Sequence, residues 1–309
     1  MKTLHNQPMQ PTANAFVGWV DMWLCLRRLI GDPLGVGKSP ITKLPKEDDS
    51  MGSAELQGEL WGKAARDWAE LQEPMHKPLW DAMLDAGNVG DGSSVCDVGC
   101  GGGGVGLLAA ERGARVSGLD AAEALIKVAR DRVPEADFRV GDMEEMPFQD
   151  RVFDAVIAAN SIQYSEDRVV ALRELRRVCD LRGRVVVGLW GPPNKVEFRD
   201  FFKAVRDALP EPPPGKGPFE LSEPGVLAGL IEDADMNVVG DGEAECPFVY
   251  ADFQAFWRAN VSAGPAQAAM HQVSEERLAN AVRSALQSYQ NPDGSMSFEN
   301  SFQYVVATP

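Results

Sequence analysis

The sequence contains few of the residues that most often hold metals or build disulfide frameworks. Its 309 residues include three histidines and five cysteines, and the spacing of the cysteines fits no common zinc pattern. We therefore expect no metal site. The cysteines also suggest no disulfide framework, which is typical of a protein from a reducing cytoplasm.

Long apolar runs and an excess of positive charge are missing as well. The most apolar candidate, residues 16–30, contains Asp21, Arg27 and Arg28, and no small-residue cleavage site follows it. This argues against a membrane span and a signal peptide. The formal net charge of −16 repels nucleic-acid phosphates and anionic membranes. We expect a cytoplasmic protein that acts on a small molecule, with neither nucleic acid nor membrane as a partner.

Residues 1–50 differ in composition from the rest, and we expect a poorly ordered extension there, before a single domain over 51–309. Residues 31–39 resemble a phosphate-binding P-loop, but Asp32 occupies the position that requires glycine. No strand precedes this segment, and Pro40 interrupts the helix that should follow. We reject the P-loop. We also hypothesise that Met51 is the native start, which N-terminal sequencing of protein from the native gene would test.

The chain from Ala54 has apolar residues at spacings of three and four, which predicts a helix that ends near Pro74. A second helix is expected over 79–87. Trp61 and Trp68 lie seven residues apart and so share one helix face. They either pack on the domain or hold a helix over a ligand pocket, and the sequence leaves both interpretations open.

Short apolar runs then alternate with helical patterns, which is typical of a parallel sheet with crossover helices. We predict a doubly wound α/β fold. The expected strands are 94–98, 115–119, 136–140, 153–159 and 184–189, and the expected helices are 105–112, 122–132 and 169–178.

The composition changes after residue 191, and we assign about 192–290 to a helical insert that covers the substrate. Ser222 is expected to cap a helix with Pro224 in its first turn. The remaining elements are predicted helices over 198–209, 253–257 and 274–289, a strand over 236–240 and a final strand over 297–307. The insert is rich in aromatic residues that form either a small core or an apolar lid: Phe219, Phe248, Tyr250, Phe253, Phe256 and Trp257.

The stretch over residues 95–106 is the strongest motif in the chain. A strand meets Asp97 and then a glycine loop in which Gly99, Gly101 and Gly104 satisfy G-x-G-x-x-G. Glycine allows a ligand to approach the backbone, and the helix N-terminus that follows favours a negatively charged group. With Asp120 about twenty residues further on, the motif alone permits a nicotinamide or flavin dinucleotide.

Three acidic positions narrow the choice of cofactor. Asp97 completes the pattern D-x-G-x-G-x-G, Asp120 ends the second strand, and Asp142 and Met143 follow the third. Together with residues 153–156 and 173–187, this arrangement resembles the class I S-adenosylmethionine-dependent methyltransferases. The most similar branch is the small-molecule one typified by quinone-biosynthesis methyltransferases (methyltransferase type 11). The segment 180–183 departs from it, since relatives usually carry Pro-Gly there.

The resemblance implies a Rossmann-like sheet of seven strands, mostly parallel, whose last strand is antiparallel, with N-terminal helices and a helical lid. It implies S-adenosyl-L-methionine as cofactor, with Asp120 accepting from the ribose hydroxyls and Asp142 from the adenine amino group. The expected cofactor-binding residues are Trp68, Asp97, Gly99, Gly101, Gly103, Asp120, Ala121, Asp142, Met143, Asn160 and Gln163. Several have simpler explanations: Asp97 and Asp142 could be turn acids, and Asn160 could cap its strand.

The function implied is methyl transfer to a small organic acceptor by in-line displacement, which requires no nucleophile from the protein. A general base would help if the acceptor is a hydroxyl or an acidic carbon. No catalytic residue is identified; His76, Tyr164 and His271 are candidates only by elimination. The alternatives are an NAD-dependent oxidoreductase and a non-catalytic S-adenosylmethionine-binding module.

Overall fold

The computed structural model describes residues 53–213 and 217–309. The predicted extension over 1–50, the P-loop-like segment and the proposed start at Met51 lie outside the described residues. Within the described ranges, no helix is long and apolar enough to cross a membrane.

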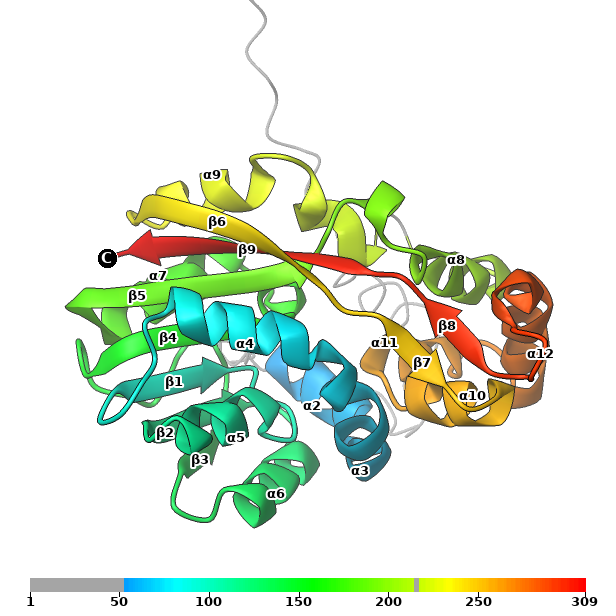
Figure 1. The fold of residues 1–309 in the computed structure, drawn as a ribbon, viewed down its shortest axis with the longest axis horizontal. Helices are drawn as coiled ribbons and strands as arrows, with labels where there is room; N and C mark the ends of the chain where they lie inside the picture. Colours follow the sequence, from blue (N-terminus) through cyan, green and yellow to red (C-terminus); the bar gives the residue numbers. More distant parts are fainter. Residues whose placement is uncertain (1–52, 214–216) are drawn as a thin grey trace, which may run out of the picture.

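A seven-stranded sheet forms the centre of the fold, in the order β3-β2-β1-β4-β5-β9-β6 (Figure 1). Strand β9 pairs antiparallel with both β5 and β6, whereas the pairs among β1 to β5 are parallel. This confirms the predicted doubly wound sheet with an antiparallel last strand. The strands are β1 (Ser94–Val98), β2 (Arg115–Asp120), β3 (Asp137–Val140), β4 (Phe153–Ala159), β5 (Cys179–Trp190), β6 (Asn237–Glu245) and β9 (Ser301–Thr308).

Helices cover both faces of the sheet because its central strands are apolar on both sides. In β4, Ala155 and Ile157 face one hydrophobic cluster, whereas Val156 and Ala158 face the other. The first cluster includes residues of α4 (Lys77–Ala86), α5 (Gly104–Glu111) and α6 (Glu123–Arg132). The second includes residues of α7 (Arg168–Val178) and α9 (Val226–Asp233).

The segment before the sheet is not the single helix that the periodicity predicts. It consists of α2 (Ala54–Gly62), the short α3 (Ala65–Asp67), a π-helical stretch over Trp68–Gln72 and a 3₁₀ turn over Glu73–His76. The break lies at Ala64, whose φ of −133° and ψ of 41° are not helical. A π-helical turn adds a residue to the helix, a feature often found at functional sites.

The insert provides α8 (Arg199–Ala208), α10 (Phe253–Val261), α11 (Gly264–Ala269) and α12 (Glu275–Ala285). The prediction that Ser222 caps a helix is wrong. Helix α9 begins at Val226 after Gly225, whose φ of 80° favours glycine, and Ser222 Oγ instead donates to the Trp190 carbonyl at 2.8 Å.

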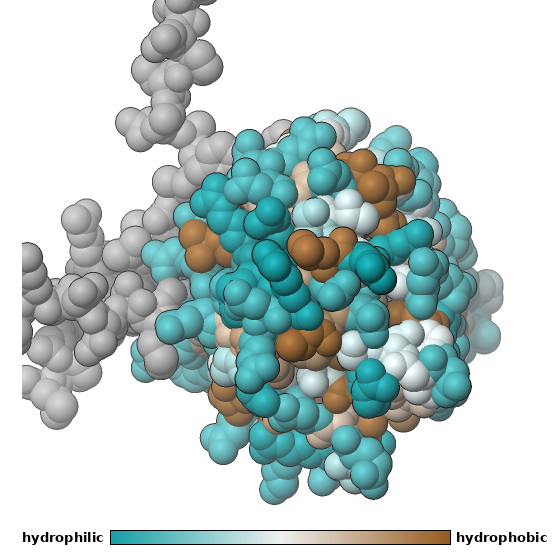
Figure 2. Space-filling model, turned by 90° about the vertical axis from the view of Figure 1, so that its left-hand side faces the viewer, coloured by the Kyte–Doolittle hydropathy of each residue, from teal (hydrophilic) through white to brown (hydrophobic). Residues whose placement is uncertain are grey.

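The expected final strand is two strands. β8 (Met296–Phe298) pairs with β7 (Phe248–Tyr250) in a separate small sheet, and β9 joins the main sheet. The buried Asn300 separates them, with its Oδ1 accepting from Phe198 N at 3.0 Å. The end of the molecule that faces the viewer in Figure 2 has apolar residues only in small separate groups among hydrophilic ones.

Candidate functional site

A pocket opens at the carboxyl ends of β1, β2 and β4, between the N-terminal helices and the insert. This is the edge at which parallel α/β sheets bind their ligands. All the predicted cofactor-binding residues except Gly103 line it, so the structure brings together side chains from four strand ends and the N-terminal segment. Gly103 instead precedes α5, with a φ of 83°, and packs against Ala129.

The glycine loop is held tightly against the neighbouring strand. The N–H groups of Gly99 and Cys100 both donate to the Leu119 carbonyl, at 2.7 and 2.9 Å. Gly99 has a φ of 71°, and a Cβ there would overlap the side chain of Ser161. The loop therefore requires glycine at this position for both backbone conformation and space.

Two carboxylates, the buried Asp97 and the partly buried Asp120, connect the loop to the ends of β1 and β2. Asp97 Oδ2 accepts from Gly106 N at 3.2 Å, and Asp120 accepts from Gly101 N and Ala122 N, both at 2.8 Å. Burial raises the pKa of both carboxyl groups, and the charge of Glu73 raises that of Asp97 further. The free energy of this negative charge falls when a cationic ligand binds beside it.

The remaining strand-end residues keep polar atoms for a ligand. Asp142 Oδ1 accepts from Glu144 N at 2.8 Å, and burial raises the pKa of its half-buried carboxyl group. Asn160 adopts a φ of 52°, and its Oδ1 is buried without a hydrogen-bond partner. A buried acceptor without a donor is costly, and a bound ligand that donates to it would remove that cost.

Glu73 is the site residue that sequence reasoning missed. Its Oε1 accepts from Gly102 N at 2.5 Å, and its Oε2 pairs with Arg132 Nη1 at 2.8 Å. Arg132 Nη1 also donates to the Gly102 carbonyl at 2.9 Å, so the two side chains contact both backbone polar groups of one residue of the glycine loop. Burial raises the pKa of Glu73, against the opposing effects of Gly102 and Arg132. A single glutamate before Pro74 carries no sequence pattern that would have revealed this contact.

Trp61 and Trp68 both line the pocket and pack edge-to-face, with ring centroids 4.7 Å apart. Both interpretations hold in part: the two rings line the pocket, and they also pack on the domain against Ala65 and Leu125, although they lie on α2 and on the π-helical stretch rather than on one helix. The Trp61 ring also packs edge-to-face on Tyr164 at 5.5 Å, which closes the wall between the N-terminal segment and the end of β4.

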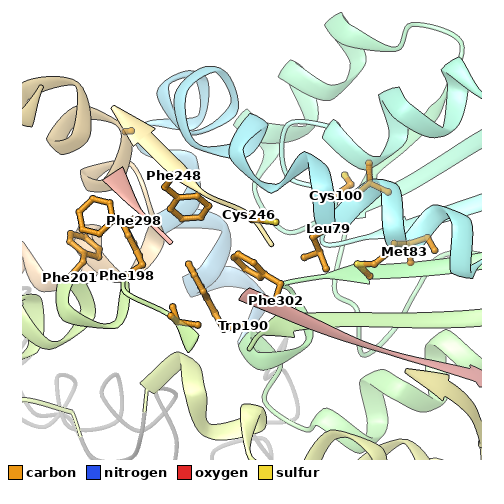
Figure 3. Packing of buried hydrophobic residues seen from close by; sticks show 14 of the residues in the cluster. Leu79, Met83, Cys100, Trp190, Phe198, Phe201, Cys246, Phe248, Phe298 and Phe302 are labelled. Atoms are coloured by element: carbon orange, nitrogen blue, oxygen red, sulfur yellow. The ribbon is translucent and has the colours of Figure 1, made fainter. Parts of the chain in front are cut away.

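The aromatic residues named as a lid are part of the core. None of the six is among the lining residues of the pocket, and Phe248 and Phe256 are fully buried. The aromatic residues of the insert that do line it precede or lie in α8: Phe198, Phe201 and Phe202. Trp190, at the end of β5, stacks between Phe302 at 4.3 Å and Phe198 at 5.8 Å (Figure 3).

The three candidate bases differ in position. His76 and Tyr164 line the pocket, whereas His271 is exposed and does not, with its Nε2 2.7 Å from Lys63 Nζ. Burial lowers the pKa of His76 to about 4, so its imidazole is neutral at neutral pH. Burial raises the pKa of Tyr164 above its usual value, so its hydroxyl stays protonated.

The sheet order and the acids at successive strand ends define a class I S-adenosylmethionine-dependent methyltransferase fold, whose cofactor is S-adenosyl-L-methionine. Residues 96–187 match the family model described as a methyltransferase domain.

Curated relatives match this chain over part of their own length. The chain is 39% identical over 83 residues to a demethylmenaquinone methyltransferase of Thermotoga maritima, covering 27% of this chain and 36% of that protein. It is 29% identical over 131 residues to a malonyl-[acyl-carrier protein] O-methyltransferase of Serratia marcescens, covering 42% and 51%. An uncharacterized protein of Mycobacterium tuberculosis is 30% identical over 149 residues, covering 47% and 53%. The chain thus spans about half or less of these relatives.

Solved structures agree on the fold. A putative methyltransferase from Bacillus halodurans superposes with a TM-score of 0.51 at 17% identity, covering 74% of this chain and 97% of that one. A putative methyltransferase from an antibiotic biosynthesis pathway of Anabaena variabilis gives 0.52 at 16% identity, covering 77% and 98%.

Proposed function

We propose that this protein transfers the methyl group of S-adenosyl-L-methionine to a small organic acceptor. The observation that carries the proposal is the convergence of Asp97, Asp120 and Asp142 on one pocket beside the glycine loop. Asp97 lies near the end of β1, Asp120 ends β2 and Asp142 follows β3, and these three strands lie side by side in the sheet. Adjacent parallel strands end at one edge, so their terminal side chains can contact different parts of one extended ligand.

Each of these residues has a chemical task that fits the cofactor. Asp120 would accept from the ribose hydroxyls, and Asp142 from the adenine amino group beside Met143. Asp97 would stand near the cationic ammonium and sulfonium groups, and Gly99 and Gly101 would let the methionine part approach the backbone. The buried Asn160 Oδ1 would gain a donor. These assignments agree with the pocket chemistry, in which every charged side chain among the described lining residues is a carboxylate.

When bound, the cofactor supplies an electrophilic methyl group on a sulfonium sulfur. The protein's contribution is to hold the acceptor in line with that methyl group and to keep water out of the pocket. Trp61, Trp68 and Tyr164 close the pocket on one side, and Trp190 closes it on another. The described cysteines are free and buried, which supports a reducing compartment such as the cytoplasm.

Isothermal titration of the full chain with S-adenosylhomocysteine tests the proposal. Binding is expected, and Asp120→Ala should weaken it at least about tenfold, because the variant loses hydrogen bonds made by a partly buried charged group. Glu135→Ala is the matched control, since it removes one exposed carboxylate and should leave the affinity unchanged. No binding at millimolar ligand would overturn the proposal, and binding of NAD(H) alone would favour the oxidoreductase.

A further inference from the structure

The pocket has a second wall that the cofactor residues do not account for. It is made by Trp190 at the end of β5 and by the start of α8, where Phe198 and Phe202 lie 5.5 Å apart. Trp190 contacts Phe202 edge-to-face at 5.4 Å, and both rings line the pocket. Figure 3 shows Trp190 and Phe198 packed against other core side chains, which hold the two rings in place. A wall of fixed rings binds a flat apolar ligand by area and ring stacking.

The charges of the described lining residues are all negative: Glu73, Asp97, Asp120 and Asp142. Each accepts a hydrogen bond from the backbone, so these carboxylates cannot move away from the pocket. Glu73 is paired with Arg132, and the other three carboxylates disfavour a negatively charged acceptor in the same pocket. The arrangement therefore selects an acceptor without negative charge.

His76 adds one directional contact to this wall. Its Nδ1 lies 3.3 Å from the Glu73 carbonyl oxygen, which can only accept, so Nδ1 carries the hydrogen and Nε2 keeps a lone pair. The ring lines the pocket, stacks with Trp80 at 6.1 Å and contacts Trp190 edge-to-face at 6.3 Å. A lone pair among aromatic rings favours a ligand that donates a hydrogen bond there.

We propose that the acceptor is an uncharged aromatic molecule bearing an O–H or N–H group, which the ring wall binds and whose hydrogen His76 Nε2 accepts. This proposal rests on the proposed function, since it names the acceptor of the same pocket. His76 is then a specificity-determining residue that selects a hydrogen-bond donor. Trp190, Phe198 and Phe202 select the flat apolar body.

The test uses three probes with the same naphthalene ring and isothermal titration into the full chain saturated with S-adenosylhomocysteine. The probes are 2-naphthol, its methyl ether 2-methoxynaphthalene, which lacks the donor, and 6-hydroxy-2-naphthoate, which carries a negative charge. We expect 2-naphthol to bind at least about tenfold more tightly than either of the others, as a buried hydrogen bond and a repelled charge imply.

Two variants show which residue causes each preference. His76→Phe should make 2-naphthol and its methyl ether bind equally. Phe202→Arg should reverse the charge preference in favour of 6-hydroxy-2-naphthoate, whereas the control Phe202→Leu should not. The acceptor proposal is wrong if S-adenosylhomocysteine binds but 2-naphthol does not bind more tightly than its methyl ether, or if 6-hydroxy-2-naphthoate binds as tightly as 2-naphthol. The methyl-transfer proposal stands in both cases. If S-adenosylhomocysteine itself does not bind, the methyl-transfer proposal fails.

Discussion

The two halves of the pocket are built in different ways. The cofactor half consists of residues at successive strand ends, and its shape comes from the backbone of the glycine loop and the acids bonded to it. The acceptor half is a set of side chains from distant segments, such as His76, Trp190 and Phe202. The first half is fixed by local chain geometry and the second by long-range packing. The two should therefore respond differently to substitution.

Gly99→Ala should have the largest effect on stability and on cofactor affinity, and it should act on the cofactor half. The new Cβ would overlap Ser161 at a residue whose φ is 71°, so the loop would have to move. We expect a loss of about 3 kcal/mol in the free energy of unfolding and at least about a 100-fold loss of S-adenosylhomocysteine affinity. Urea unfolding and isothermal titration measure these two quantities.

Gly90→Ala is the control for this prediction. A Cβ at Gly90 meets nothing within 4 Å, so both stability and affinity should stay close to those of the wild type. If Gly99→Ala behaved like Gly90→Ala, the backbone of the loop would not define the cofactor half, and the contrast between the two halves would disappear.

The cofactor half could be predicted from the sequence because local chain geometry fixes it. Buried parallel strands produce short apolar runs, and the acids that end them stand at fixed positions, so Asp97 and Asp120 were placed at the correct strand ends. The sheet was predicted as well, because a short helical pattern follows the apolar runs of β1, β2 and β4. Strand β5 was placed too short at its start, since its first residues, such as Asp180, are polar.

The acceptor half could not be predicted in this way. Nothing in the periodicity of residues 54–71 signals the π-helical turn that precedes Glu73 and His76. The aromatic residues of the insert share one composition, and only packing decides that Phe202 lines the pocket while Phe248 and Phe256 fill the core. Composition identified an aromatic region but not the residues that face the ligand.

Glu73 and Arg132 join the two halves, and breaking this pair should have the next largest effect. Either Glu73→Gln or Arg132→Met leaves one side chain beside Gly102 without its charged partner. Because the side chain of Glu73 is 5% exposed and that of Arg132 23%, each single variant should cost about 2–3 kcal/mol in the free energy of unfolding. The double variant should cost less than the sum, which a double-mutant cycle measures.

The exposed pair Lys203–Asp207 on α8 provides the control cycle, since its side chains are 71% and 59% exposed. Its coupling should be below about 0.5 kcal/mol. Additive effects at Glu73 and Arg132 would mean that the two residues do not act together on the loop.

The pH dependence of stability tests the acceptor half by itself and should give the smallest effect. The unfolded chain protonates His76 near its usual pKa of 6.5, whereas the folded protein does so only near 4. The unfolded state therefore binds more protons between these values, and stability from this group is full above pH 6.5 and falls as the pH approaches 4. By pH 5 the loss should be about 2 kcal/mol, and His76→Gln should remove it.

Urea unfolding at pH 7.5 and pH 5 measures the difference. The pocket acids Glu73, Asp97 and Asp120, whose raised pKa values act in the opposite direction, are common to both proteins. His271→Gln, at an exposed position, is the matched control variant. If wild type and His76→Gln lose the same stability, His76 is not held neutral by burial, and the acceptor half lacks the lone pair that its proposed ligand requires.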